Sequence, residues 1–434
     1  MNYEITEATQ SAINPGAVKD IYYYGETNLS KQAFPVVKNN RFKQQLPNMG
    51  AGTSQVVISP NMGVSDVVLR VQMPVAAGAI TYTDASLPTG WGYSLIKTVS
   101  VRYGGSSQYF WQGSQILAQN LLDCENQTKA EALLTLGGQF QTGNGCSGAE
   151  ALLYINLPHN SPRAEGKPLP LCSDLLTQPI VLTIEMVSPD SVFAGSNGNA
   201  PSGLPTQLAA AEVQVNQEYM SDSADLLARR VDMNSSAISY PLKYFAQQEI
   251  LNTIQGVSGG DFSGQQNIVL TGFRSGEVRD IMMWLEVQQP GQNLGSSTQF
   301  VWYPIQNAEL KYNGEVFFTA SGNAAQLWNL VEDKKIPGFN TTVLDPAPSP
   351  ATATQTLSTW TLVKFSQVDV PRDRMYDLVS GKPILNAVIN FSYYLPPAVQ
   401  TLLSASSSNR AVLHAVYFYN SSLLFSRGTT EYIF

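Results

Sequence analysis

An internal repeat constrains this chain of 434 residues more than any other feature of its sequence. Residues 63–71 read Gly-Val-Ser-Asp-Val-Val-Leu-Arg-Val, and residues 277–285 read Glu-Val-Arg-Asp-Ile-Met-Met-Trp-Leu. This alignment, at an offset of 214, places Asp66 opposite Asp280. Apolar residues follow each aspartate at every second position: Val67, Leu69, Val71 and Met73 in the first copy, and Ile281, Met283, Leu285 and Val287 in the second.

Further along the chain the offset becomes 209, and six identical pairs fall within 27 ungapped positions. Composition alone would give about one or two. The pairs are Ile96 and Ile305, Tyr103 and Tyr312, Gly105 and Gly314, Gly113 and Gly322, Asn120 and Asn329, and Leu121 and Leu330. A weaker similarity joins residues 178–180 to 382–384. The pattern predicts a duplicated domain of roughly 200 residues. We interpret the Asp, Tyr, Gly and Asn pairs as structural positions that define the repeat.

Short runs of alternating apolar residues, separated by Gly, Pro, Asn and Ser, predict antiparallel β-structure. The clearest runs are 67–73, 180–186, 387–393, 412–419 and 423–425, with a turn at 420–422. Helical spacing is rare, and the candidate helices are 112–122, 223–230 and 244–254. Two stretches rich in Gly and Pro, 188–206 and 340–356, are predicted to be loops at one end of a sandwich.

Duplication, domain size and antiparallel strands together predict an all-β fold. We expect two tandem eight-stranded jelly-roll β-sandwiches with a few short helices in loops. The expected organisation is an N-terminal arm over 1–35, a first jelly roll over 36–220, a linker with short helices over 221–250, and a second jelly roll over 251–434.

The composition excludes several classes of protein. Hydrophobic residues make up 43% of the chain and charged residues only 13%, which is typical of a folded chain and not of a disordered one. A net charge of −8 argues against nucleic-acid binding, because displacing counterions from phosphates requires clustered Lys and Arg. Such a low charged fraction with many aromatic residues instead suggests extensive burial against other copies of the chain.

The cysteines and the N-terminus bear on the cellular compartment. Cys124, Cys146 and Cys172 are odd in number and widely spaced, so we expect reduced thiols and folding in a cytosol. The first residues lack the basic and apolar regions of a signal peptide. No apolar run approaches the roughly 18 residues of a transmembrane helix.

The motifs that usually indicate catalysis or cofactor binding are missing from the sequence. The two histidines, His159 and His414, lie in a turn and in an apolar run, and neither has the setting of a nucleophilic triad or a metal site. Residues 380–383, Ser-Gly-Lys-Pro, lack the glycine and hydroxyl residues of a phosphate loop. We therefore expect no enzymatic activity, no cofactor and no metal.

Two polar groups leave alternatives open. Residues 369–374 hold Asp369 and Asp373, which could seat a carboxylate pair for glycoside hydrolysis but are better explained as a structural charge network. The basic residues Lys38, Arg41 and Lys43 are too few to separate a membrane or genome contact from a solvated segment.

Several short segments resemble the double jelly-roll major capsid proteins of double-stranded DNA viruses, most like those of large eukaryotic DNA viruses and virophages. The similar segments are 25–42, which resembles the first-strand region, 213–250, which resembles the link between jelly rolls, 365–369, Phe-Ser-Gln-Val-Asp, and 417–428, which resembles the final strand pair. Lys364 and Gln367 depart from the family's Asn-Phe-Ser-Arg-Ile-Asp segment. The likeness extends over nearly the whole chain.

The resemblance implies a structural major capsid protein that forms pseudo-hexagonal homotrimeric capsomers of an icosahedral virion. Its implied partners are other copies of itself, within the trimer and in neighbouring capsomers, together with minor capsid proteins, penton proteins and an internal lipid membrane. Direct contact with nucleic acid is not expected. The protein would be located in the virion shell and would be assembled in the cytoplasm or nucleus of an infected cell.

Two other functions are compatible with a tandem β-sandwich. One is a carbohydrate-binding or carbohydrate-active protein, for which Asp369 and Asp373 are the motivating residues. The other is a minor capsid or spike protein of the same lineage. Duplication over the full chain favours the major capsid protein, because minor ones often carry a single jelly roll.

Overall fold

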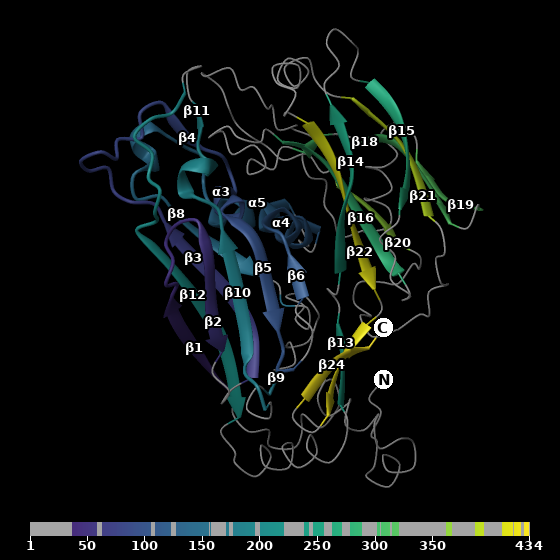
Figure 1. The fold of residues 1–434 in the computed structure, drawn as a ribbon, viewed down its shortest axis with the longest axis horizontal. Helices are drawn as coiled ribbons and strands as arrows, with labels where there is room; N and C mark the ends of the chain where they lie inside the picture. Colours follow the sequence, from purple (N-terminus) through teal and green to yellow (C-terminus); the bar gives the residue numbers. More distant parts are fainter. Residues whose placement is uncertain are drawn as a thin grey trace.

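The computed structural model describes most of the first half of the chain and the strands of the second half (Figure 1). The described residues are 37–58, 63–105, 109–122, 127–155, 157, 171–172, 177–195, 200–220, 238–242, 246–255, 263–270, 278–288, 302–303, 305–312, 315–320, 362–366, 387–394, 410–419, 421–426 and 429–433. Within them the structure is mostly β-sheet with a few short helices, as the sequence predicted.

The first half forms a sandwich of two antiparallel sheets. One sheet has the order β1 (Val37–Gln45), β12 (Ala210–Met220), β3 (Gly63–Gln72) and β8 (Glu150–Ile155), and β9 (Leu171–Cys172) also pairs with β3. The other has the order β2 (Gly52–Ile58), β10 (Ile180–Met186), β5 (Ile96–Arg102) and β6 (Tyr109–Trp111). The first strand of each sheet pairs with its last strand along the chain, as in a jelly roll.

The core of this sandwich lies between the two sheets and follows the alternation of the sequence. The predicted inward residues Val67, Leu69, Val71 and Met73 are completely buried. In β10 every second residue from Ile180 to Met186 is buried, while the residues between them are half-buried on the outer face. Side chains alternate between the faces of a strand, so one face supplies the core and the other remains polar.

The second half repeats most of this topology in its strands. One sheet has the order β14 (Ala246–Gln255), β22 (Arg410–Tyr419), β16 (Val278–Gln288) and β17 (Trp302–Tyr303). β20 (Leu362–Ser366) also pairs with β16, in the register that β8 has with β3, whereas β17 precedes β18 in the chain and has no such counterpart among the described strands of the first half. The other has the order β15 (Ser263–Leu270), β21 (Ala387–Tyr394), β18 (Ile305–Tyr312) and β19 (Glu315–Ala320). A third sheet joins β13 (Ile238–Leu242), β23 (Ser421–Ser426) and β24 (Thr429–Ile433).

The two halves also share a β-bulge. Where β12 pairs with β3, the register steps from Asp66 to Val64 and leaves Ser65 without a partner. Where β22 pairs with β16, the register steps from Asp280 to Val278 and leaves residue 279 without a partner. The irregularity therefore precedes an aspartate in both halves, at the offset of 214. A bulge bends its strand locally, so the halves agree in shape as well as in strand order.

The ladders give a third offset if Arg102 and Lys311 are equivalent. Val181 lies opposite Arg102, and Val388 lies opposite Lys311, so β10 and β21 would then be related by an offset of 207. The weaker similarity between residues 178–180 and 382–384, at an offset of 204, stays a prediction, because residues 382–384 lie outside the described part of the chain.

Within the described residues, three short α-helices accompany the strands: α3 (Trp91–Ser94), α4 (Gly113–Leu122) and α5 (Gln127–Leu136). The predicted helix at 112–122 is confirmed as α4. Helix α5 was not expected from the sequence, although half of its ten residues are Ala or Leu, which favour a helix. The candidate helix at 223–230 lies outside the described residues.

Two local predictions in the second half are wrong. Residues 244–254 were expected to be helical, but 246–255 form β14, because ladder pairing with β22 outweighs the helix propensity of Ala, Gln, Glu and Leu. Residues 420–422 were expected to form a turn, but β23 begins at Ser421, and β22 and β23 belong to different sheets. The chain changes sheet at this point instead of forming a hairpin. β14 also begins within residues 221–250, the range expected to form the linker.

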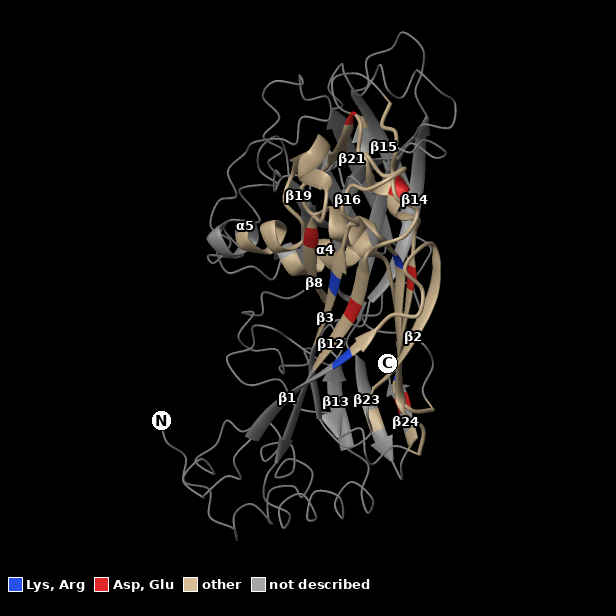
Figure 2. Ribbon diagram, turned by 90° about the vertical axis from the view of Figure 1, so that its left-hand side faces the viewer, with Lys and Arg blue, Asp and Glu red and all other residues tan. Residues whose placement is uncertain are grey.

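Charged residues are scattered over the described part of the chain. Figure 2 views the molecule from the side of the first sandwich and shows Lys, Arg, Asp and Glu singly along the strands, with uncharged residues over most of the ribbon. This distribution agrees with the low charged fraction of the sequence.

Removal of a core side chain from β10 tests this account of the first sandwich. Leu182 is completely buried, so we expect Leu182→Ala to lower the free energy of unfolding by about 2–5 kcal/mol. The neighbouring Thr183 is on the outer face, and we expect Thr183→Ala to cost less than about 1 kcal/mol. Urea unfolding followed by tryptophan fluorescence measures both, and equal shifts of the first transition would contradict the assigned faces.

Candidate functional site

Among the described residues, no group of three or more His, Cys, Asp or Glu side chains is arranged to hold a metal ion. In the same part of the chain, no helix is long and apolar enough to cross a membrane. His414 lies within β22, opposite Ile250 of β14 and Trp284 of β16. His159, residues 369–374 and residues 380–383 lie outside the described residues. The candidate functional features are therefore the surfaces of the first sandwich.

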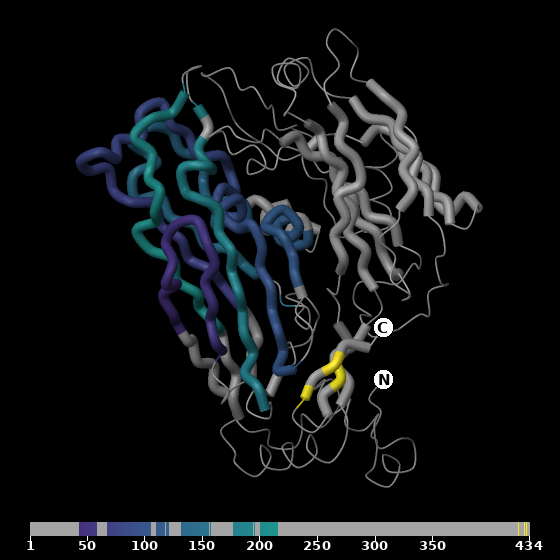
Figure 3. The backbone as a smooth tube through the Cα atoms, in the orientation of Figure 1, coloured from purple at the N-terminus to yellow at the C-terminus, as the bar shows by residue number. Residues whose placement is uncertain are grey.

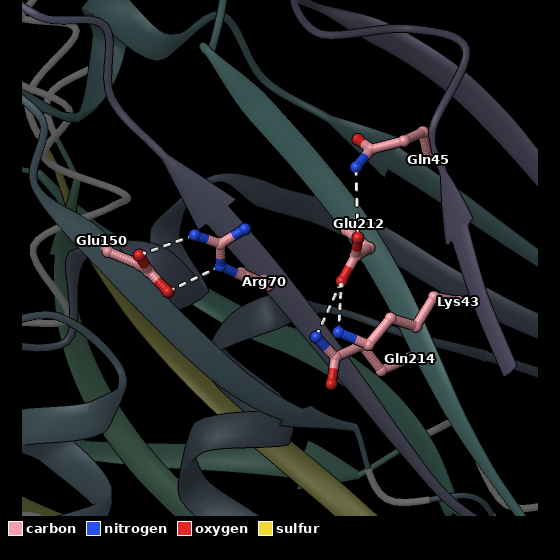
Figure 4. Close-up of polar contacts among 6 residues, drawn as sticks. All are labelled: Lys43, Gln45, Arg70, Glu150, Glu212 and Gln214. Atoms are coloured by element: carbon pink, nitrogen blue, oxygen red, sulfur yellow. Dashed lines mark hydrogen bonds and ion pairs between the residues drawn. The ribbon is translucent and has the colours of Figure 1, made fainter. Parts of the chain in front are cut away.

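A row of polar side chains crosses the outer face of the β1-β12-β3-β8 sheet (Figure 4). We call it the polar row, and its members are Lys43, Gln45, Arg70, Glu150, Glu212 and Gln214. Side chains alternate between the two faces of a strand. In β12, Ala211, Val213 and Val215 are buried in the core, so Glu212 and Gln214 between them lie on the outer face. The members of the polar row lie on four strands of the sheet, and their contacts join β1 to β12 and β3 to β8.

The strongest contact of the polar row joins β3 to β8. The guanidinium of Arg70 donates from Nε to Oε1 of Glu150 at 2.6 Å, and from Nη2 to Oε2 at 2.9 Å. The two parallel bonds fix both planar groups. Since about a third of each side chain is exposed, the pair contributes modestly to stability and mainly fixes the register of two strands that are distant in sequence.

Glu212 is the centre of the other half of the polar row. Its carboxylate accepts hydrogen bonds from Gln45 at 3.2 Å and from Gln214 at 2.8 Å, and the ammonium of Lys43 lies 3.7 Å away. β1 carries three basic residues, Lys38, Arg41 and Lys43, and the structure describes only the side chain of Lys43. This side chain makes an intramolecular contact with Glu212.

Charge pairing lowers the pKa of two carboxyl groups on the sandwich surface. The hydrogen bonds from Arg70 hold the pKa of Glu150 below its usual value, and those from Lys97 and Thr98 do the same for the pKa of Glu185. Lys97 lies 2.8 Å from Glu185 and bridges β5 to β10 in the other sheet. Both carboxylates are therefore ionised at neutral pH and act as structural contacts between strands.

Three long connections meet at one end of the first sandwich (Figure 3). They follow β3, β6 and β10, and a small sheet of β11 (Ala194–Gly195), β4 (Ala85–Leu87) and β7 (Gln141–Thr142) joins them. We call this structure the loop cap. It includes most of the predicted loop 188–206, in which the short η4 turn (Pro189–Val192) and β11 are the regular parts. The predicted loop 340–356 lies outside the described residues.

The loop cap has its own small core. The rings of Tyr82 and Phe193 lie 5.6 Å apart, and the Tyr82 hydroxyl donates to the carbonyl of Pro74 at 2.6 Å. Cys146 is a free, buried thiol, and burial raises its pKa to about 12. A protonated thiol is a poor nucleophile, so Cys146 is a packing residue. Cys172 ends β9, and Cys124 lies outside the described residues.

Two of the repeat positions, Gly113 and Asn120, lie together where α3, α4 and β8 meet. A third, Tyr103, is completely buried just after β5. The amide of Asn120 donates to the Tyr93 hydroxyl at 3.2 Å and to the Tyr154 carbonyl at 2.9 Å. Gly113 begins α4 so close to α3 that a Cβ would lie 2.2 Å from the carbonyl oxygen of Tyr93. In the first half, Gly113 and Asn120 therefore hold α4 against α3 and the sandwich.

The remaining repeat positions are less constrained or not described. Gly105 is exposed, and a Cβ there would meet nothing within 4 Å. Asp66, Asp280 and Tyr312 lie in β3, β16 and β18. Gly314, Gly322 and Asn329 lie outside the described residues.

The polar row and the small sheet of the loop cap were not expected from the sequence, although the loop 188–206 was. The alternation of β12 could have indicated an outward Glu212, but its partner Gln45 precedes it by 167 residues, and only the register identifies that pairing. The strands of the loop cap have two or three residues each, too few to produce a periodic signal.

Comparisons with known proteins connect this geometry to one kind of fold. No protein-family model and no curated protein matches the sequence. Among solved structures, the VP54 protein of the virus PBCV-1, fitted into a reconstruction of the virophage Sputnik, matches with a TM-score of 0.60 at 15% identity, covering 93% of this chain and 98% of that one.

Two further solved structures match over most of the chain. The virophage Sputnik gives a TM-score of 0.57 at 11% identity, with 92% of this chain and 89% of that one covered. The major capsid protein of mavirus gives a TM-score of 0.51 at 12% identity, with 91% and 90% covered.

The fold is that of the double jelly-roll viral capsid proteins. The chain has two tandem jelly-roll sandwiches, and its structural neighbours include viral major capsid proteins. The resemblance found in the sequence is confirmed at the level of the fold.

The close approach at Gly113 can be tested against Gly105. In an ordinary helix Gly→Ala stabilises by about 1 kcal/mol, but in Gly113→Ala the methyl group would collide with the carbonyl oxygens of Tyr93 and Ile96, so we expect a loss of about 1–3 kcal/mol. Gly105→Ala is the matched control and should change the unfolding midpoint little. A stabilised Gly113→Ala variant would contradict the assigned contact.

The Arg70–Glu150 pair should make stability depend on pH. Since its pKa is lowered on folding, Glu150 stabilises the fold above the usual pKa of 4.5, and this contribution disappears as the pH falls through the lower folded-state pKa. We expect Glu150→Gln to cost about 0.2–1 kcal/mol at pH 7 and almost nothing near pH 3. Thermal unfolding of both proteins across this range measures the difference, and a cost independent of pH would argue against ion pairing.

Proposed function

We propose that this chain is a major capsid protein, which forms homotrimeric, pseudo-hexagonal capsomers of an icosahedral virion. The observation that carries the proposal is the match in fold over 93% of this chain and 98% of the VP54 chain.

A physical argument links two sandwiches per chain to a shell. Closed oligomers are symmetric, and three chains with two similar sandwiches each present six similar units around a threefold axis. Such a ring fills a lattice nearly as a hexamer does, while its two kinds of sandwich can differ in sequence. The role requires no catalysis, cofactor or metal.

The proposed partners follow from the same role. Copies of this chain would contact each other within and between capsomers, and minor capsid proteins, penton proteins and an internal membrane would contact the assembled shell. The net charge of −8 is unsuited to direct contact with DNA. Assembly would take place in the cytoplasm or nucleus of the infected cell.

The proposal also covers the repeat positions and the domain ranges. We assign Asp66 and Asp280, Tyr103 and Tyr312, Gly105 and Gly314, Gly113 and Gly322, and Asn120 and Asn329 to equivalent places in the two sandwiches. The shared bulge beside Asp66 and Asp280 supports the first pair. The first jelly roll would occupy 36–220 and the second 251–434, with an arm over 1–35 and a linker over 221–250. Because β14 begins at Ala246, the second jelly roll would extend a few residues into the range of the linker.

Oligomeric state and shape test the proposed function. We expect the purified chain of 47.2 kDa to sediment as a trimer of about three times that mass. Electron microscopy should show a six-lobed, threefold outline about 75 Å across, the size of six domains of about 200 residues in a ring.

A monomer at every concentration would contradict the proposal. Specific binding on a glycan array by such a monomer would support the alternative of a tandem carbohydrate-binding protein.

A further inference from the structure

The loop cap carries an exposed apolar hairpin between β3 and β4. We call residues 74–80, Pro-Val-Ala-Ala-Gly-Ala-Ile, the apolar tip. All five residues from Val75 to Ala79 are exposed. Val75 is 68% exposed, more than the other exposed large hydrophobic residues of the described part, Val57, Phe110 and Leu136, at 50–57%. Single exposed apolar residues are common, but five in succession at a loop tip indicate an interaction site.

Hydrogen bonds hold both sides of the apolar tip in place. On one side, Gly148 N–H donates to the Pro74 carbonyl at 3.1 Å, and Ala76 N–H donates to Ser147 Oγ at 2.8 Å. On the other side, Thr81 N–H donates to the Gly203 carbonyl at 3.0 Å. The tip is therefore anchored to two other connections of the loop cap, and its apolar surface cannot turn inward without breaking these bonds.

The turn itself also favours a fixed shape. Ile80 N–H donates to the Ala77 carbonyl at 3.1 Å, and Gly78 has a φ of +61°, the pattern of a type II′ hairpin turn. A rigid tip loses little conformational entropy when it binds. The geometry is thus suited to docking in a preformed position.

The chemistry of the apolar tip favours a protein as its partner. No charged residue lies between Arg70 and Asp84. Lipid-binding segments combine bulky Trp, Phe or Leu with Lys or Arg, and the tip has neither. Ala and Gly leave the backbone accessible to another protein surface. A neutral segment is also one place where two chains that each carry a charge of −8 can approach closely.

The position of the tip favours a second copy of this chain. The connection from β3 to β4 projects on the side of the first sandwich that faces away from the strands of residues 246–419 (Figure 1). In a closed ring of identical chains, each copy meets its neighbours through two different faces. The side of the first sandwich that faces away from the second half is available as one of these faces.

We infer that the apolar tip is a contact between copies of this chain, buried against the neighbouring subunit when the capsomer forms. The inference rests on the proposed function and adds the surface by which the subunits recognise each other. It requires that the tip is exposed in the free chain and covered in the oligomer.

Substitutions of opposite charge at Val75 test the contact. We expect both Val75→Asp and Val75→Lys to raise the dissociation constant of the oligomer by about tenfold or more, because either charge would lose its hydration in the interface. Gln139, an exposed residue between α5 and β7, provides matched controls, Gln139→Asp and Gln139→Lys, which should leave the constant unchanged. Sedimentation of the full chain over a range of concentrations measures all five proteins.

The outcomes separate this inference from the proposed function. A wild-type chain that stays monomeric would remove both. A wild-type oligomer whose dissociation constant is unaffected by either Val75 substitution would overturn the inference alone. Weakening by Asp but not by Lys would also overturn it, because that result indicates repulsion between acidic chains without burial.

A second measurement does not depend on the charged variants being folded. In the Ala77→Cys variant, a maleimide reagent should label the new thiol of the tip in the dissociated chain but not in the oligomer. The labelling of the parent protein, which has its own cysteines, is the background to subtract. Equal labelling in both states would contradict burial. Binding of wild-type chain, but not of Val75→Asp, to vesicles of phosphatidylcholine and phosphatidylserine would assign the tip to lipid and overturn the inference.

Discussion

The pairing of the first strand with the last strand is the constraint on which each sandwich depends. β1 pairs with β12 along nine residues, and β14 pairs with β22 in the same way. These ladders place every connection at one end or the other of the sandwich. The loop cap exists because the connections after β3, β6 and β10 all emerge at the same end. The polar row supports this pairing from outside, where Glu212 of β12 binds side chains of β1.

The sequence allowed prediction of what depends on local periodicity or on the repeat. Alternation identified β3 and β10 with their buried faces, and helical spacing identified α4. Residues 246–255 were misread because their composition favours a helix, whereas pairing with the distant β22 decides their conformation. Of the repeat positions, Gly113 and Asn120 have clear structural roles in the first half. The apolar tip could not be identified in advance. A run of small apolar residues reads the same in the sequence whether it is buried or exposed, and only the structure shows that Val75 to Ala79 are exposed.

The shared bulge shows how closely the two halves correspond in spite of divergent sequences. Ser65 and residue 279 interrupt the ladder at the same point, although the strands around them share few identical residues. A bulge bends the strand that carries it and increases its local twist. The two halves therefore share a local bend although few side chains around it are identical.

The distance in sequence between β1 and β12 has a consequence for synthesis on the ribosome. β1 ends at Gln45, and its partner begins at Ala210. At about 5–20 residues per second, β1 waits roughly 10 to 30 s for its partner to be translated. During that interval an unpaired strand could join another nascent chain, and positive charges discourage this. β1 carries Lys38, Arg41 and Lys43, positive charges of the kind that oppose pairing with another chain.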